Sequence, residues 1–164
     1  MSLEKLTGLK LFHNHDTVEL ALKFFPFGSP AFARLVSDVR RRVMEEVAAS
    51  DLPGMIFTYV WAFDDPRDRR QVEAWSSIFS SHGRKMLLVE LEASQAVRLK
   101  RDGTALRLAQ KPSKGDRAAS LRRLVALDAA HKLNSTDEFA GAERHVRIDN
   151  TRPRRPPRSP TLSV

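Results

Sequence analysis

The run from Gly54 to Phe63 constrains the fold more than any other part of this sequence. Residues 55–63 are almost all apolar, aromatic or β-branched. Such a run is typical of a strand that is covered on both faces, and strands of this kind occur mainly in parallel sheets flanked by helices. We therefore expect an α/β fold in which this segment is a buried strand.

Extended and helical patterns alternate along the rest of the chain. Asp16 and Ser29 are expected to cap two helices, and Pro30 suits the first turn of the second one. This second helix carries one apolar stripe, formed by Phe32, Leu35, Val36, Val39, Val43 and Val47. The whole pattern predicts strands at 9–13, 55–63, 85–92 and 145–149, and helices at 16–25, 29–49, 66–83, from 94 and at 116–133. Strands that alternate with helices imply a parallel sheet with right-handed crossovers.

Composition narrows the class of protein. The 164 residues fit one domain, and a hydrophobic fraction of 41% is enough for a single core. The sequence has no cysteine, which excludes disulfides and thiolate metal sites. No apolar run approaches the ~20 residues that span a bilayer, and no signal-peptide pattern is present. We therefore expect a cytoplasmic protein with no membrane partner.

The charge is distributed unevenly. Residues 1–97 carry 12 Lys and Arg against 13 Asp and Glu, whereas residues 98–164 carry 16 against 7. The net charge of +8 therefore comes from the last part of the chain. A one-sided basic field attracts polyanions, whether nucleotide phosphates or nucleic acid. Residues 152–164 hold four prolines and four arginines and are expected to form a disordered tail.

Several short motifs, in a fixed order over roughly residues 4–151, suggest a family. The motifs are Leu11-Phe-His-Asn-His15, Phe25-Pro-Phe-Gly28, Ile56-Phe-Thr58, Arg107 to Asp116 with Lys111-Pro-Ser-Lys114, Leu133-Asn-Ser135 and Arg147-Ile-Asp-Asn-Thr151. As an ordered set they resemble the adenylate-kinase and shikimate-kinase-like group of P-loop kinases. The resemblance is greatest to bacterial proteins labelled AAA-family ATPase or shikimate kinase-like.

The resemblance implies a three-layer P-loop NTPase fold with five parallel strands in the order 2-3-1-4-5. The four strands predicted here correspond to the family's second to fifth strands, so the fold is expected to be incomplete at its N-terminus. The family's phosphate loop, G-x-x-x-x-G-K-[ST], occurs nowhere in this sequence. Without a central strand, the strands at 55–63 and 85–92 are expected either to pair with each other or to leave the chain unstable, because several orphaned buried backbone groups exceed a small domain's stability.

The carboxyl end of the first predicted strand is the first candidate site. Ligands of α/β folds bind at this edge of the sheet, and His13, Asn14 and His15 follow the strand directly. The resemblance implies that these residues and Arg34 contact the acceptor substrate. A polar turn leading into a helix is the alternative. Asp64 follows the second strand and is a candidate Mg²⁺ ligand, although Asp64 and Asp65 also suit a helix cap.

The basic segment 98–117 is the second candidate site, with seven cations in 20 residues. The resemblance implies a lid that closes on the phosphates, with Arg107, Lys111 and Lys114 in catalysis and Arg101 at the nucleotide. A solvated basic loop or a nucleic-acid contact is the alternative. Residues 98–138 contain no aromatic residue on which bases could stack, which disfavours nucleic acid.

These observations lead to one expected function and one alternative. The expected function is a kinase-like protein of 1–151, ancestrally transferring phosphate from ATP with Mg²⁺ to a small-molecule acceptor, and inactive as given because the phosphate loop is absent. The alternative is a non-enzymatic basic module that binds nucleic acid or another polyanion through residues 98–158.

Overall fold

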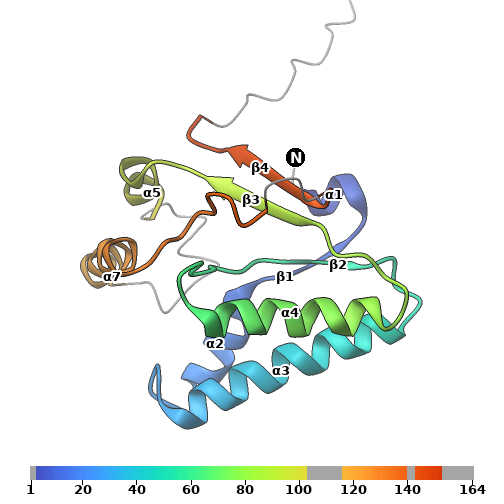
Figure 1. The fold of residues 1–164 in the computed structure, drawn as a ribbon. Helices are drawn as coiled ribbons and strands as arrows, with labels where there is room; N and C mark the ends of the chain where they lie inside the picture. Colours follow the sequence, from blue (N-terminus) through green and yellow to red (C-terminus); the bar gives the residue numbers. More distant parts are fainter. Residues whose placement is uncertain (1–2, 103–115, 140–142, 153–164) are drawn as a thin grey trace, which may run out of the picture.

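A computed structural model of the chain describes residues 3–102, 116–139 and 143–152. Figure 1 shows helices and strands in alternation, as the sequence predicts. The strands are β1 (Lys10–Phe12), β2 (Met55–Phe57), β3 (Leu88–Glu92) and β4 (His145–Asp149). The helices are α1 (Leu3–Thr7), α2 (Asn14–Leu22), α3 (Pro30–Ala49), α4 (Pro66–Ser80), α5 (Gln95–Asp102) and α7 (Arg117–Ala130).

The strands form two separate parallel pairs, which we call half-sheets. β1 pairs with β2, so that Leu11 lies opposite Ile56, and β3 pairs with β4, so that Val89 lies opposite Val146. In the described part of the chain β2 and β3 are not hydrogen-bonded to each other. The mixed α/β class and the parallel direction are therefore confirmed. Of the two outcomes expected for the strands 55–63 and 85–92, pairing with each other is not found, and an unstable chain stays a prediction.

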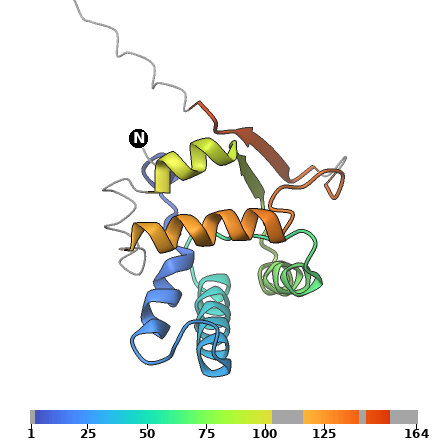
Figure 2. The same cartoon turned by 90° about the vertical axis from the view of Figure 1, so that its left-hand side faces the viewer.

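Helices cover one face of both half-sheets. Met44 of α3 and Val72 and Trp75 of α4 form a buried cluster, and Phe57 of β2 and Leu88 of β3 pack against it. Because the same cluster contacts both half-sheets, their helix-covered faces point in the same direction. α5 and α7 lie at the carboxyl ends of β3 and β4, and Figure 2 shows them from that side.

The helix starts follow the sequence with one correction, whereas α2, α4 and α7 each end three residues before the predicted end. Ser29 and Asp65 cap α3 and α4, where their side chains accept hydrogen bonds from the Phe32 and Arg67 amides. Asp16, in contrast, is not the cap of α2. His13 caps this helix, and Asp16 closes a capping box by accepting a hydrogen bond from the His13 amide at 2.8 Å.

Three predicted strands are longer than the observed ones. The segment 9–13 is a strand only over β1, the segment 55–63 only over β2, and the segment 85–92 only over β3. A β-strand is defined by backbone hydrogen bonds to a neighbouring strand. An apolar run shows which residues can be buried, but not where these hydrogen bonds begin and end. Residues at 58–63 still contribute to packing, since Tyr59 and Trp61 contact the cluster around Trp75.

Candidate functional site

The carboxyl end of β1 brings together residues from three elements. The Asn14 amide donates to Thr58 Oγ1 at 3.0 Å, which ties the start of α2 to the segment after β2. His15 donates its amide to His13 Nδ1 at 3.1 Å, and its ring lies 3.4 Å from the Glu19 carboxylate. His13, Asn14 and His15 therefore stand together at the sheet edge where ligands of α/β folds bind.

Arg40, and not Arg34, is the arginine of α3 that contacts this edge. Arg34 is exposed, whereas Arg40 is half-buried. The Arg40 guanidinium donates to Thr17 Oγ1 at 3.0 Å and to both the carbonyl and the side-chain oxygen of Asn14. Burial lowers the pKa of Arg40, an effect that the nearby Tyr59 and Asp68 partly offset. Arg40 therefore fixes the position of Asn14 from the helix side.

The sequence contains a signal for Arg40 that the predicted stripe missed. Phe32, Val36, Met44 and Ala48 are the buried residues of α3, and they are spaced four or eight residues apart. Arg40 occupies the position between Val36 and Met44 in this series. An arginine in an otherwise buried stripe requires polar partners, and the carboxyl end of β1 supplies them.

Asp64, the candidate Mg²⁺ ligand, is contacted by the two residues that follow α7. One carboxylate oxygen accepts a hydrogen bond from the Lys132 amide at 2.9 Å, and the other lies 3.5 Å from His131 Nδ1. Desolvation raises the pKa of Asp64, but the bond from Lys132 and the neighbouring His131 outweigh it and leave the pKa below its ordinary value. Over the described ranges, no three His, Cys, Asp or Glu side chains are grouped to hold a metal ion.

Residues 131–139, which we call the connecting segment, link the carboxyl ends of the two half-sheets. On the β2 side, the Phe63 amide donates to the Lys132 carbonyl at 2.8 Å. On the β3 side, the Asn134 amide group and the Ser135 hydroxyl donate to the Glu90 carboxylate at 2.7 and 2.6 Å. Trp61 and Phe63 also pack against Phe139. The segment therefore spans from one half-sheet to the other.

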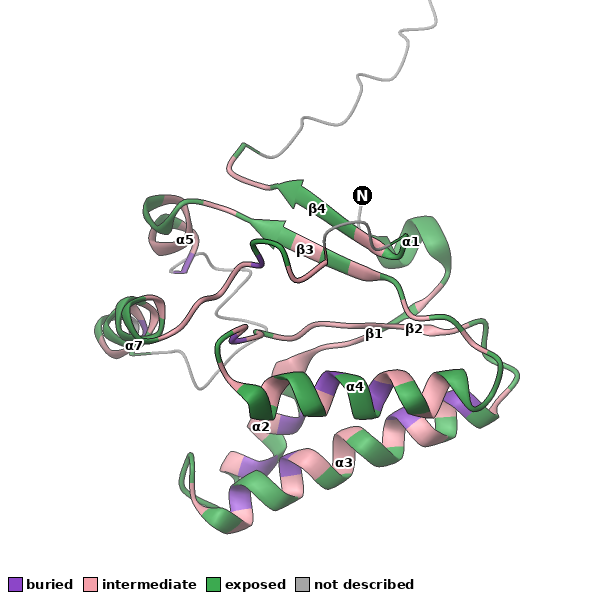
Figure 3. Ribbon diagram, viewed as in Figure 1, coloured by how far each residue is buried: buried purple, intermediate pink, exposed green. Residues whose placement is uncertain are grey.

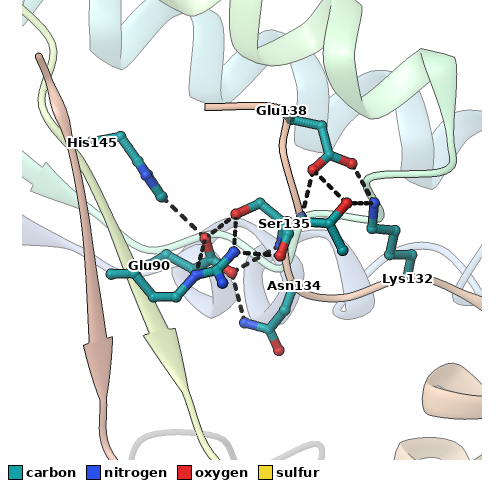
Figure 4. A network of polar contacts seen from close by, with 8 residues as sticks. Glu90, Lys132, Asn134, Ser135, Glu138 and His145 are labelled. Atoms are coloured by element: carbon teal, nitrogen blue, oxygen red, sulfur yellow. Dashed lines mark hydrogen bonds and ion pairs between the residues drawn. The ribbon is translucent and has the colours of Figure 1, made fainter. Parts of the chain in front are cut away.

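Glu90 is the centre of the polar network that holds the connecting segment (Figure 4). Its carboxylate also lies 3.0 Å from His145 Nε2 and 3.5 Å from Arg147 Nε, both on β4. Desolvation raises the pKa of Glu90, but the hydrogen bonds from Ser135, Asn134 and His145 outweigh it and lower the pKa to about 2. Nothing in the sequence pattern singles out Glu90, because a glutamate in a strand becomes informative only when its partners are known.

An open groove of about 680 Å³ lies between α5, α7, β4 and the connecting segment. Gln95 and Arg98 of α5 line it, and both bind the Asp128 carboxylate of α7. Arg101 does not line the groove. Its guanidinium donates to the Asn150 carbonyl at 2.7 Å and to that of Thr151 at 3.3 Å, which ties α5 to the end of β4.

The remaining predicted lid residues, Arg107, Lys111 and Lys114, lie outside the described residues, and so does the greater part of the tail. No described helix is both long and apolar enough to cross a membrane. No family model matches this chain, and comparisons with curated proteins and with solved structures give no match.

Proposed function

We propose that this chain is the acceptor-side and lid-side part of a P-loop kinase-like phosphotransferase, and that it is inactive without a phosphate loop. The observation that supports the proposal is the order of the strands. A sheet of order 2-3-1-4-5 without its first strand leaves two parallel pairs, 2-3 and 4-5. The described strands form two such pairs, β1–β2 and β3–β4.

The residues at the carboxyl edges fit the two sides of such a reaction. His13, Asn14 and His15, supported by Arg40, stand where an acceptor would bind, and the groove beside α5 and α7 stands on the opposite half-sheet. In the reaction, the acceptor hydroxyl oxygen forms a bond to the γ-phosphorus of ATP while the bond to the β-phosphate oxygen breaks and ADP leaves.

Magnesium enters this proposal only with the nucleotide, whose phosphates are its usual ligands. Asp64 accepts a hydrogen bond from Lys132 and lies beside His131, and the described residues group no set of three His, Cys, Asp or Glu ligands. Asp64 as a ligand of this magnesium stays a prediction.

The chain alone should bind ATP with a dissociation constant no better than about millimolar, because its sequence has no G-x-x-x-x-G-K-[ST] loop to surround the β- and γ-phosphates. Isothermal titration calorimetry with and without Mg²⁺ measures this directly. Magnesium-dependent binding in the micromolar range would show that another part of the chain replaces the loop.

Supplying the absent part is the decisive test of the function. An apolar strand, G-x-x-x-x-G-K-[ST] and a helix fused before residue 3 should create ATP-dependent phosphotransfer or ATP hydrolysis. The matched control is the same fusion with the loop lysine changed to alanine. In the active fusion, Lys111→Ala should lower kcat more than it weakens ATP binding, whereas His13→Ala should raise the KM of the acceptor. A folded fusion that is inert with hydroxylated acceptors and with water refutes the kinase-like function and favours the basic module.

A further inference from the structure

The edge of β3 that faces away from β4 has unpaired backbone groups. The Leu88 amide donates to the Arg144 carbonyl at 2.9 Å, just before β4. Successive amides of a strand point to opposite sides, so the Glu90 amide also faces β4 whereas the Val89 and Leu91 amides face the other way. The described part of the chain offers these two amides no backbone acceptor.

The edge of β2 that faces away from β1 is open in the same manner. The Thr58 amide donates to the Phe12 carbonyl at 3.4 Å, which continues the pairing of β2 with β1. By the same alternation, the Phe57 and Tyr59 amides point away from β1. Among the described residues no backbone acceptor meets them either.

The face of the half-sheets that points away from α3 and α4 is apolar, and in the described part of the chain its side chains are about half exposed. In Figure 3 the strands β3 and β4 are largely exposed. The side chains on this face alternate with those that face the helices, and each is exposed by 40–60%: Leu11, Val60, Leu87, Val89, Leu91, Val146 and Ile148. Seven aliphatic side chains on one face, each about half exposed, are more than the singly scattered apolar residues of an ordinary surface.

We infer that the open edges and the apolar face together bind one strand–helix unit of another polypeptide. The strand lies parallel between β2 and β3 and accepts hydrogen bonds from the amides of Phe57, Tyr59, Val89 and Leu91. The helix that follows the strand lies across the apolar face, with its own apolar side on Leu11, Val89 and Ile148. Parallel sheets with helices on both faces are the stable form of this architecture.

The open edges favour this occupant over a second copy of the chain. A strand that pairs with both β2 and β3 must have both of its own edges free. A second copy has no strand to insert, because each of its four described strands is already paired. A strand–helix unit pairs with both open edges and covers the apolar face.

The inference rests on the proposed function, because that function implies a further strand between β2 and β3. Its test does not require phosphotransfer. The probe is a synthetic peptide with an apolar strand of about six residues, a Gly-Ser turn and an amphipathic helix of about 14 residues. It contains no phosphate loop. The full chain is mixed with the peptide, and amide hydrogen exchange is measured by NMR. The expected result is at least about tenfold slower exchange at Phe57, Tyr59, Val89 and Leu91.

Matched variants show whether the apolar face takes part. Val89→Asp and Ile148→Asp should each abolish the protection, whereas Val125→Asp on α7 should preserve it, since Val125 and Val89 are both 45% exposed. Circular dichroism of each variant confirms that it is folded. Unchanged exchange at the four amides with saturating peptide overturns the inference, and so does a chain that is already a dimer with these amides protected. If the peptide protects the four amides while the phosphate-loop fusion is inert, the docking inference stands and only the kinase-like function is refuted.

Discussion

The β1–β2 half-sheet rests on apolar packing against α3 and α4, whereas the β3–β4 half-sheet depends much more on polar contacts. In the first half, Phe57 packs edge-on against Trp75 at 5.1 Å between ring centroids, beside the buried Met44. In the second, Leu88 reaches this cluster, while Glu90 binds β4 and the connecting segment through charged and polar groups.

The difference reflects which layers are present. Parallel strands usually lie between two helical layers, and their side chains are apolar on both faces for that reason. Over the described residues, the helical layer that packs on the half-sheets is formed by α3 and α4, and its buried cluster contacts more residues of β2 and the segment after it than of β3. The β3–β4 pair therefore exposes apolar residues to solvent and relies on the Glu90 network for its position.

The largest expected effect on stability comes from truncating a buried apolar side chain, compared with truncating an exposed one on β3. Met44→Ala should lower the free energy of unfolding by about 2–5 kcal/mol, because Met44 is 2% exposed and the substitution leaves a cavity. Leu91→Ala should change it by less than about 0.5 kcal/mol, because Leu91 is 60% exposed. Urea unfolding of both variants measures the difference. Equal losses would show that the apolar face of β3 is buried in solution.

A smaller effect is expected from the polar network. Glu90→Gln should destabilise the chain by about 1–3 kcal/mol, because Ser135, His145 and Arg147 lose a charged acceptor. Glu92→Gln is the control on the same strand, since Glu92 is exposed. Hydrogen exchange should accelerate at the Ser135 amide, which donates to Glu90 at 2.9 Å. Normal protection of Ser135 in Glu90→Gln would mean that the aromatic contacts of Phe139 alone hold the connecting segment.

The third prediction concerns the loss of folding stability at low pH. The pKa of Glu90 is lowered from 4.5 to about 2, so its contribution to stability is present above the unfolded value and is lost as the pH falls from about 4.5 toward 2. Unfolding free energies at about pH 5 and about pH 3 should therefore differ more for the unmodified chain than for Glu90→Gln. The same pH dependence in both proteins would assign the acid sensitivity to other carboxylates.

The sequence was sufficient for features that depend on local chemistry. The caps at Ser29 and Asp65 and the strand at 145–149 were predicted, since each depends on residues close in the chain. The cap at Asp16 was wrong because His13 supplies the same type of acceptor one turn earlier. A sequence pattern does not distinguish two such neighbouring caps.

The candidate site was predicted only in part, because its supporting residues are distant in the chain. His13–His15 were identified from the end of a strand, but Arg40, Thr58 and the Glu90 network depend on contacts 26 to 55 residues apart. Their residue types fit many other environments equally well. The side chains of these residues acquire a role only when the fold places their partners.

Amide hydrogen exchange of the unmodified chain, resolved by residue, tests the central claim that β2 and β3 have open edges. We expect slow exchange at Thr58, Leu88 and Glu90, whose amides face β1 or β4, and fast exchange at Phe57, Tyr59, Val89 and Leu91. Slow exchange at all seven amides would mean that β2 and β3 pair with each other or with a further strand, and that their edges are not open.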